Sequence, residues 1–361
     1  MNTYTHAAML AELTGIADRA RHVFLDREQL SRVADVMRRR HHVDDFQVRR
    51  DSPDLTPADL LQFYMVAGVH NFLIWQRDLS GQVVPWTVHV NGERRYGAPA
   101  VYACHVRALQ RGRNILDPDY LTSMTLAAME DYYRDEETGR VTLQFIPQRL
   151  AKFHEIGKVL KEKHNRSFLT LLERAEGYLF RDDGQGIAQQ LLTHFPLSYR
   201  DWPFCKLVMV TVGNLYQDRD RLFPTASRYR DLINLHDPER LEVGADYYRP
   251  FFLYRVGVLR ISTVLREHLV KRELLDREGP IEREYRAWTI LGTRELARRL
   301  GVIPHDLARE TWAMGFMRCR PCRIGVSEEE VPCSYRPICH SYNEETVLMQ
   351  ALWPLVLTTS Y

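Results

Sequence analysis

Apolar residues recur at helical spacing along most of this chain, and charged residues fill the positions between them. Around residue 155, for example, Leu150, Phe153 and Ile156 fall on one face of a helix, while Lys152 and Glu155 fall elsewhere. The pattern predicts helices over residues 58–76, 99–111, 118–134, 148–164, 167–180, 184–194, 203–217, 246–268, 281–300 and 305–317.

The helix over 58–76 has the clearest predicted start. Thr56 is expected to cap it, with Pro57 at its first position. On such a helix Asn71 and Trp75 lie one turn apart, so the two side chains could line one pocket. The alternative is that both belong to the core, where a buried asparagine needs hydrogen-bond partners.

A small β element is predicted beside these helices. Thr87–Val90 and Arg94–Tyr96 flank Asn91-Gly92, a dipeptide suited to the positive φ angles of a type I′ hairpin turn. Long buried β-branched strands between the helices are missing, which argues against a doubly wound parallel sheet. We therefore expect a mainly α fold with a small β-hairpin element.

Composition adds little that would direct the chain to a charged partner. Its 361 residues are 45% hydrophobic, and 49 basic against 47 acidic residues give a net charge of only +2. The net charge therefore gives no reason to expect a nucleic-acid partner. No apolar run approaches the ~20 residues that cross a bilayer, and the first residues lack a signal-peptide pattern. We expect a cytoplasmic protein with no membrane partner.

Four of the six cysteines fall in one short segment near the end of the sequence: Cys319, Cys322, Cys333 and Cys339. Because this segment is rich in Cys, Arg and Pro and lacks periodicity, we divide the chain into a helical domain, 1–315, and a cysteine-rich segment with a tail that packs on it, 316–361. Four thiolates suit tetrahedral zinc or a 4Fe–4S cluster, and His340 could replace one of them. Four unliganded thiols are the remaining alternative.

Arginines surround these cysteines in the sequence, at Arg318, Arg320, Arg323 and Arg336. They could contact phosphate groups, or they could offset the negative charge of the thiolates. Sequence alone leaves both interpretations open.

Two carboxylates are candidates for chemistry. The chain has no phosphate-binding glycine loop, nucleophile elbow or zincin helix. Asp201, in LSYRDWPF, and Asp246, in VGADYYRPF, each follow a turn-like sequence and precede a predicted helix. A carboxylate in that position either caps the helix or acts in catalysis.

Several blocks, in order between about residues 60 and 300, resemble the queuosine salvage protein family, whose members release queuine from queuosine or its 5′-phosphate. The hairpin with its following helix and the stretch Phe145–Phe168 are similar to the family pattern. Shorter similar blocks are Asn71-Phe72-Leu-Ile-Trp75, Phe195-Pro…Ser198-Tyr199-Arg200-Asp201, Ala245-Asp246-Tyr247…Pro250 and Glu284-Tyr-Arg286.

This resemblance implies an N-glycosyl hydrolase with a helix-hairpin-helix DNA-glycosylase-like fold and a small-molecule nucleoside or nucleotide substrate. Asp246 would be the catalytic carboxylate, because it could stabilise positive charge on the sugar and deprotonate the attacking water. No cofactor is needed for this hydrolysis. The other implied site residues are Asp201 as a second carboxylate, Asn71, Phe72 and Asn214 at the base, Trp75 and Tyr247 stacking on it, and Arg200 and Arg286 as phosphate-binding or ion-pair residues.

The chain departs from the family pattern at two positions of the implied base pocket. Asn214 stands where the family has an aspartate, and Phe251 where it has a glutamine. Changed polar groups change which base fits, so the expected substrate is a queuosine-like or other 7-deazaguanine nucleotide. The alternatives are a DNA-glycosylase-like enzyme acting on modified guanine in DNA or RNA, and a non-catalytic deazaguanine nucleotide-binding protein.

Overall fold

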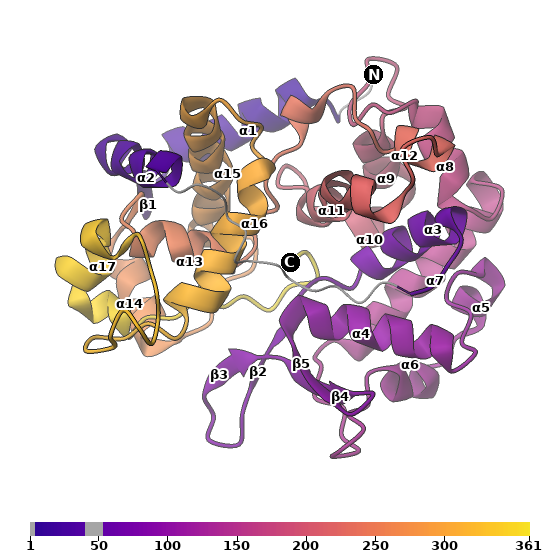
Figure 1. Ribbon diagram of the computed structural model, residues 1–361, viewed down its shortest axis with the longest axis horizontal. Helices are drawn as coiled ribbons and strands as arrows, with labels where there is room; N and C mark the ends of the chain where they lie inside the picture. The colour runs from indigo at the N-terminus through magenta and orange to yellow at the C-terminus, as the bar shows by residue number, and fades with distance from the viewer. Residues whose placement is uncertain (1–3, 40–52) are drawn as a thin grey trace.

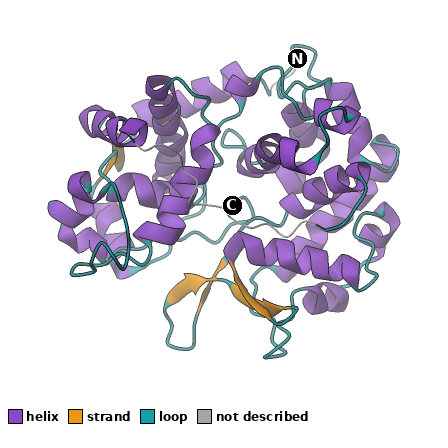
Figure 2. Cartoon of the chain, viewed as in Figure 1, coloured by secondary structure: helices purple, strands orange, loops and turns teal. Residues whose placement is uncertain are grey.

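The computed structural model describes residues 4–39 and 53–361, and helices dominate it (Figures 1 and 2). The first helices are α1 (His6–Asp18), α2 (Arg27–Arg39), α3 (Pro57–Gly68), α4 (Gly97–Gln110), α5 (Pro118–Ser123), α6 (Leu126–Tyr132), α7 (Ile146–Lys163), α8 (Phe168–Ala175), α9 (Ile187–His194), α10 (Pro196–Tyr199), α11 (Lys206–Leu222) and α12 (Arg228–Asp231). They are followed by α13 (Tyr248–Arg255), α14 (Thr263–Lys271), α15 (Pro280–Leu300), α16 (Asp306–Ala313) and α17 (His340–Asn343). Shorter 3-10 turns are η1 (Pro238–Arg240), η3 (Arg336–Ile338) and η4 (Thr346–Met349), and η2 (Met314–Cys319) is a π-helix. The mainly α prediction is confirmed.

The strands of the described part form small antiparallel pairs. These are β1 (Val23–Leu25) with β6 (Leu259–Ile261), β2 (Trp75–Arg77) with β3 (Val83–Pro85), and β4 (Thr87–Val90) with β5 (Glu93–Tyr96). The β4–β5 hairpin is the predicted one. Its loop residues Asn91 and Gly92 have φ angles of 52° and 75°, as a type I′ turn requires.

The predicted helix over 58–76 is wrong in its second half. Helix α3 begins as expected, with the Thr56 hydroxyl accepting a hydrogen bond from the backbone of Asp59, but it ends at Gly68. The chain then turns, and Trp75 is the first residue of strand β2. Asn71 and Trp75 therefore do not lie one turn apart on a helix.

A buried arginine explains why the helix stops. Arg149 of α7 is fully buried and donates hydrogen bonds to the carbonyls of His70, at 2.6 Å, and Phe72, at 2.7 Å. These carbonyls are thus satisfied by a side chain from another helix instead of by continued helical bonding. Tertiary contacts, which the local pattern does not contain, override the helical periodicity here.

Two further predicted helices are divided in the structure. The stretch 246–268 becomes α13, β6 and the start of α14, because the chain turns at Gly257, where φ is 85° and a Cβ atom would lie 2.7 Å from His340. The stretch 118–134 becomes α5 and α6, with Thr125 capping the second. The remaining predicted helices are present with shifted ends, and the stretch predicted to run to 317 continues from α16 into η2.

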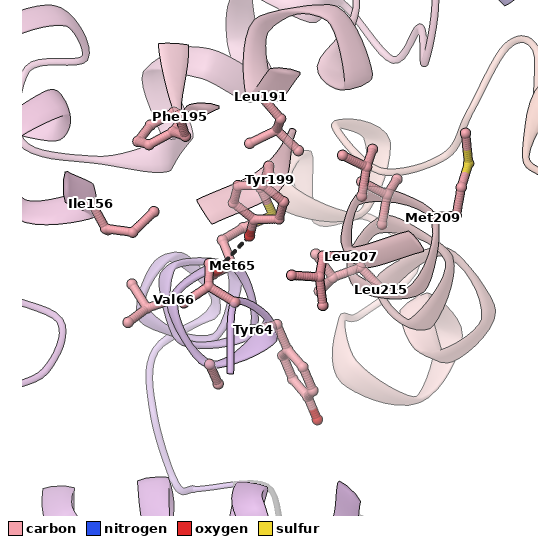
Figure 3. Close-up of a cluster of buried hydrophobic side chains, with 14 of the residues drawn as sticks. Tyr64, Met65, Val66, Ile156, Leu191, Phe195, Tyr199, Leu207, Met209 and Leu215 are labelled. Carbon is pink, nitrogen blue, oxygen red and sulfur yellow. Dashed lines mark hydrogen bonds between the residues drawn. The ribbon is translucent and has the colours of Figure 1, made fainter. Parts of the chain in front are cut away.

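Two hydrophobic clusters hold the fold together. In the first, α3, α7, α9 and α11 pack around buried residues such as Met65 and Leu191, and the Tyr199 hydroxyl donates a 2.6 Å hydrogen bond to the Met65 carbonyl (Figure 3). The second joins α2, α13 and α15 to residues of the last segment, including Tyr335 and Trp353. The cysteine-rich segment thus shares a core with earlier helices, and the division at residue 315 stays a prediction.

The last residues lie between the two groups of helices (Figure 1). The Tyr361 carbonyl accepts a 2.8 Å hydrogen bond from the backbone of Leu73, and Lys152 of α7 donates to the Thr359 carbonyl at 3.0 Å. On the other side, the Tyr361 hydroxyl donates to Glu282 of α15 at 2.8 Å. This segment therefore connects α7 to α15. In residues 4–39 and 53–361, no helix is both long and apolar enough to cross a bilayer.

Candidate active site

Two adjoining pockets open where the two groups of helices meet, and they share Asn71, Ala98, Asp246 and Trp312. The larger has a volume of about 630 Å³ with its open mouth included. Its other lining residues come from α4, α11, α13 and α16: Pro99, Tyr102, Val210, Asn214, Gln217, Arg249, His305, Ala308 and Arg309. The adjoining pocket is completed by Phe72, Ile74, Gly97, Lys206, Tyr247, Tyr248 and Tyr361.

Asp246 lies in the wall of both pockets, just before helix α13. The residue is 7% exposed. Oδ1 accepts hydrogen bonds from the backbone N–H groups of Tyr248, at 2.9 Å, and Arg249, at 3.2 Å, and so caps the helix. Oδ2 accepts a 2.6 Å bond from Nη1 of Arg249. The carboxylate is therefore fixed in orientation by three donors.

Two buried cations lie near this carboxylate. Arg249 also donates to the carbonyls of Gly244, at 2.8 Å, and Ala308, at 3.1 Å, so its guanidinium ties α13 to α16. Lys206, at the start of α11, donates through Nζ to the carbonyl of Asn71. Burial lowers the pKa of Lys206 to about 7, against the opposing attraction of Asp246. Lys206 can therefore exchange a proton near neutral pH.

Trp312, which lines both pockets, belongs to an aromatic pair. Trp312 of α16 and Phe316 of η2 stack with ring centroids 4.9 Å apart and planes 19° from parallel. Phe316 faces the first turn of α4, where a Cβ atom on Gly97 would lie 3.8 Å from its ring. Sequence reasoning missed this pair, although the spacing of Trp312 and Phe316 by four residues places both on one helix face.

His305 and helix α11 meet at the back of the larger pocket. A Cβ atom at Gly213 would lie 2.0 Å from the His305 ring, so only glycine allows this approach. The His305 Nδ1–H donates to the Glu242 carbonyl at 3.0 Å, which fixes the ring orientation. The neighbouring Asn214 is 7% exposed and lines the same pocket. Sequence reasoning did not single out His305.

The structure brings together five of the residues implied by the resemblance. Asn71, Asn214 and Asp246 line the larger pocket, and Phe72 and Tyr247 line the adjoining one. They come from three segments far apart in the sequence, around residues 71, 214 and 246. The structure therefore brings these five residues together at the two pockets, and the roles implied for them stay predictions.

Four other implied site residues lie elsewhere. Asp201 and Arg286 form a buried ion pair, with Nη1 2.9 Å from Oδ1, and neither is among the described residues that line the two pockets. Arg200 is exposed. Trp75 is 3% exposed and packs in the second hydrophobic cluster, away from the pocket lining, because strand β2 and not a helix carries it.

The four clustered cysteines line a separate cavity. None of the residues that line the two pockets also lines this cavity. Within the described ranges, no group of three or more His, Cys, Asp or Glu residues is arranged to hold a metal ion. His340 does not line this cavity; its ring contacts Arg260, Glu344 and Glu345.

Comparison with known proteins places the chain in a family. Residues 52–311 match the queuosine salvage protein family. The chain is 25% identical over 300 residues to the queuosine 5′-phosphate N-glycosylase/hydrolase of Sphaerobacter thermophilus, covering 81% of this chain and 85% of that protein. It is 22% identical over 294 residues to the protein of that name from Nematostella vectensis, covering 78% and 79%. The match to the family spans most of the chain and every residue that lines the two pockets except Trp312 and Tyr361, and the chain therefore belongs to the queuosine salvage protein family.

Proposed function

We propose that this protein is an N-glycosylase that hydrolyses the N-glycosidic bond of queuosine 5′-phosphate or a closely related 7-deazaguanine nucleotide. The observation that carries the proposal is Asp246, a buried carboxylate fixed at the start of α13 in the wall of both pockets. Membership of the family and the names of the relatives support the same activity.

The chemistry follows from the position of Asp246. As the bond between the base nitrogen and the sugar carbon breaks, positive charge develops on the sugar, and the carboxylate stabilises that charge. Water then bonds to the sugar carbon and gives its proton to Asp246, which acts as general base. The products are the free base and the sugar phosphate.

The leaving base must receive a proton, and a 7-deazaguanine has no N7 to accept one. Lys206 lines the adjoining pocket and has a pKa of about 7. We assign it as the donor that protonates the departing base. Asn71 and Asn214, which present amide groups to the larger pocket, would bond the edge of the base.

Trp312 and an arginine complete the proposed binding site. Trp312 presents a flat ring to both pockets, and a planar base would stack on it. Arg309 lines the larger pocket while donating to Asp218 at 3.0 Å, and its guanidinium would pair with the 5′-phosphate.

We also infer that the fold is of the helix-hairpin-helix DNA-glycosylase type. An aspartate at the start of a helix, facing a pocket between two groups of helices, supports this inference.

The test is release of free base, followed by mass spectrometry, from queuosine and from queuosine 5′-phosphate. Wild type should release base and Asp246→Asn should not. Asp182→Asn, a change at an exposed carboxylate, is the matched control and should behave as wild type. Absence of release from every nucleotide would overturn the proposal, and release only from a DNA oligonucleotide with modified guanine would move the activity to a polynucleotide substrate.

A further inference from the structure

One hydroxyl group beside the candidate active site lacks a hydrogen-bond partner. Tyr248 is the first residue of helix α13 and lines the adjoining pocket, two residues after Asp246. It is 3% exposed, and within residues 4–39 and 53–361 no group forms a hydrogen bond with its hydroxyl. A buried hydroxyl without a partner is unfavourable and uncommon in native proteins. This group therefore calls for a partner that the described chain does not supply.

The position of Tyr248 is fixed by its surroundings. Its backbone N–H donates to Oδ1 of Asp246 at 2.9 Å. Gly315 of η2 lies so close that a Cβ atom there would be 2.3 Å from the Tyr248 carbonyl. The Tyr248 ring makes edge-to-face contacts with Trp312 and Phe316, with ring centroids 6.2 and 5.2 Å away. The ring is therefore held at a set place relative to the carboxylate of Asp246.

The rings around Tyr248 do not offer an acceptor to its hydroxyl. Trp353 adds a third ring to those of Trp312 and Phe316, with its centroid 5.0 Å away, and none of the three side chains has an acceptor atom. Burial raises the pKa of Tyr248 well above its ordinary value, so the hydroxyl keeps its proton and can donate it in a hydrogen bond. An acceptor can reach the hydroxyl from the adjoining pocket, which Tyr248 lines.

The adjoining pocket differs in chemistry from the larger one. Asn214, Gln217 and Arg309 line only the larger pocket. The adjoining pocket has a volume of about 310 Å³ with its open mouth included. The residues that line only this pocket are mainly apolar or aromatic: Phe72, Ile74, Gly97, Lys206, Tyr247, Tyr248 and Tyr361. Such walls suit a largely apolar group that carries a few polar atoms.

Queuosine has a group of this kind at position 7 of its base, a cyclopentene ring with hydroxyl groups that is joined through an amine. We propose that Tyr248 is a specificity-determining residue, whose hydroxyl donates a hydrogen bond to a hydroxyl oxygen of this 7-substituent. The amine is protonated at neutral pH and cannot accept a hydrogen bond, which leaves the hydroxyl oxygens as acceptors. The inference rests on the proposed function, because it places the 7-substituent in the adjoining pocket while the edge of the base lies in the larger one.

The consequence is discrimination between bases. A base with the hydroxylated substituent satisfies the Tyr248 hydroxyl, whereas a base without it leaves that buried group unpaired. Sites that are built to bond a hydroxyl of the substrate reject analogues that lack it for this reason. Tyr248 should therefore affect the choice of base and not the chemistry at the sugar.

The test compares the binding of two free bases, queuine and 7-deazaguanine, by isothermal titration calorimetry of the full chain. Free bases have no glycosidic bond, so the result does not depend on turnover. Tyr248→Phe should raise the Kd for queuine roughly 5- to 150-fold, because the substituent loses its donor in a buried site. It should leave the Kd for 7-deazaguanine unchanged.

Tyr254→Phe is the matched control from the same helix. Tyr254 is also buried, but its hydroxyl donates to the Leu352 carbonyl at 2.5 Å and it lines neither pocket. This variant should have a lower unfolding free energy and unchanged affinity for both bases. Tyr248→Phe should show the reverse, since it removes a hydroxyl that has no partner in the free protein.

Several outcomes would overturn the inference. These are an unchanged Kd for queuine in Tyr248→Phe, an equal rise for both bases, or no binding of queuine to wild type. A lower unfolding free energy of Tyr248→Phe without ligand would show that the hydroxyl already has a partner. The proposed function is decided separately, by release of base from queuosine 5′-phosphate by wild type.

Discussion

Arg249 holds the carboxylate of Asp246 from three residues further along the chain, with Nη1 2.6 Å from Oδ2 and both side chains buried. The other oxygen of Asp246 caps helix α13. One side chain therefore has two duties, since it starts a helix and faces the pocket. The guanidinium of Arg249 balances the negative charge of Asp246 before positive charge develops on the sugar.

Substitutions of Asp246 should separate its role as a helix cap from its role in catalysis. Both Asp246→Asn and Asp246→Ala should lower the rate of base release by at least ~100-fold, because neither side chain can act as general base. Both also leave Arg249 without its carboxylate. Only the amide keeps an oxygen for the cap, so Asp246→Ala should be less stable than Asp246→Asn by about 1 kcal/mol in denaturant unfolding. Equal stability of the two would contradict the capping role.

Trp312 should contribute mainly to substrate binding. Loss of a stacked aromatic ring costs about 1–3 kcal/mol per base, so Trp312→Leu should raise KM roughly 5- to 150-fold and change kcat less. Trp75→Leu is the matched control, because Trp75 packs in the second hydrophobic cluster. It should lower the melting temperature and leave KM unchanged. A raised KM in Trp75→Leu together with an unchanged KM in Trp312→Leu would instead support the stacking role first expected for Trp75.

The Asp201–Arg286 pair should be required for folding. Arg286 also lies over the rings of Phe204 and Tyr361, at 4.1 and 4.3 Å from their centroids. Arg286→Met leaves a buried carboxylate unpaired and should destabilise the protein by about 3–5 kcal/mol. Adding Asp201→Leu should recover part of that loss. A raised KM with unchanged unfolding free energy would instead place Arg286 at the substrate.

Lys152 should make stability depend on pH. Burial lowers its pKa to about 7 in the folded chain, while the unfolded value is 10.5. Between these values the unfolded state binds more protons, so this lysine makes the unfolding free energy rise with pH. Below pH 7 both states are protonated and its unfavourable contribution is constant. The difference in unfolding free energy between wild type and Lys152→Met should therefore change by up to ~1.4 kcal/mol per pH unit from pH 7 to 9, in favour of wild type as pH rises. A constant difference over that range would show that Lys152 titrates normally.

Local patterns predicted the elements that local interactions specify. The hairpin at Asn91-Gly92 follows from residues that adopt positive φ, and the start of α3 follows from Thr56 and Pro57. The end of α3 depends on Arg149, which lies some eighty residues further along the chain and carries no local signal for that role. Because α3 was predicted to run too far, Trp75 was also predicted on a helix, whereas it begins strand β2.

The candidate site shows the same contrast. The position of Asp246 before a predicted helix left capping and catalysis both open, and the resemblance to the family singled it out; the structure places it at the pocket. Asp201 had the same local signature, but Arg286 from α15 holds it in an ion pair. His305 and Trp312 enter the pocket through the packing of α16 against α11 and α13, a contact between distant segments that composition and spacing do not reveal.

The two adjoining pockets are lined by both hydrophobic clusters: Tyr102 and Ala308 of the first cluster line the larger pocket, and Tyr247 and Tyr248 of the second line the other. A molecule bound there would clamp the two halves to each other, and it would find no such surface on the unfolded chain. At a free concentration of a hundred times Kd, that linkage adds about 2.7 kcal/mol to the unfolding free energy. The supply of its own nucleotide would therefore govern how much of this protein survives proteolysis in the cell.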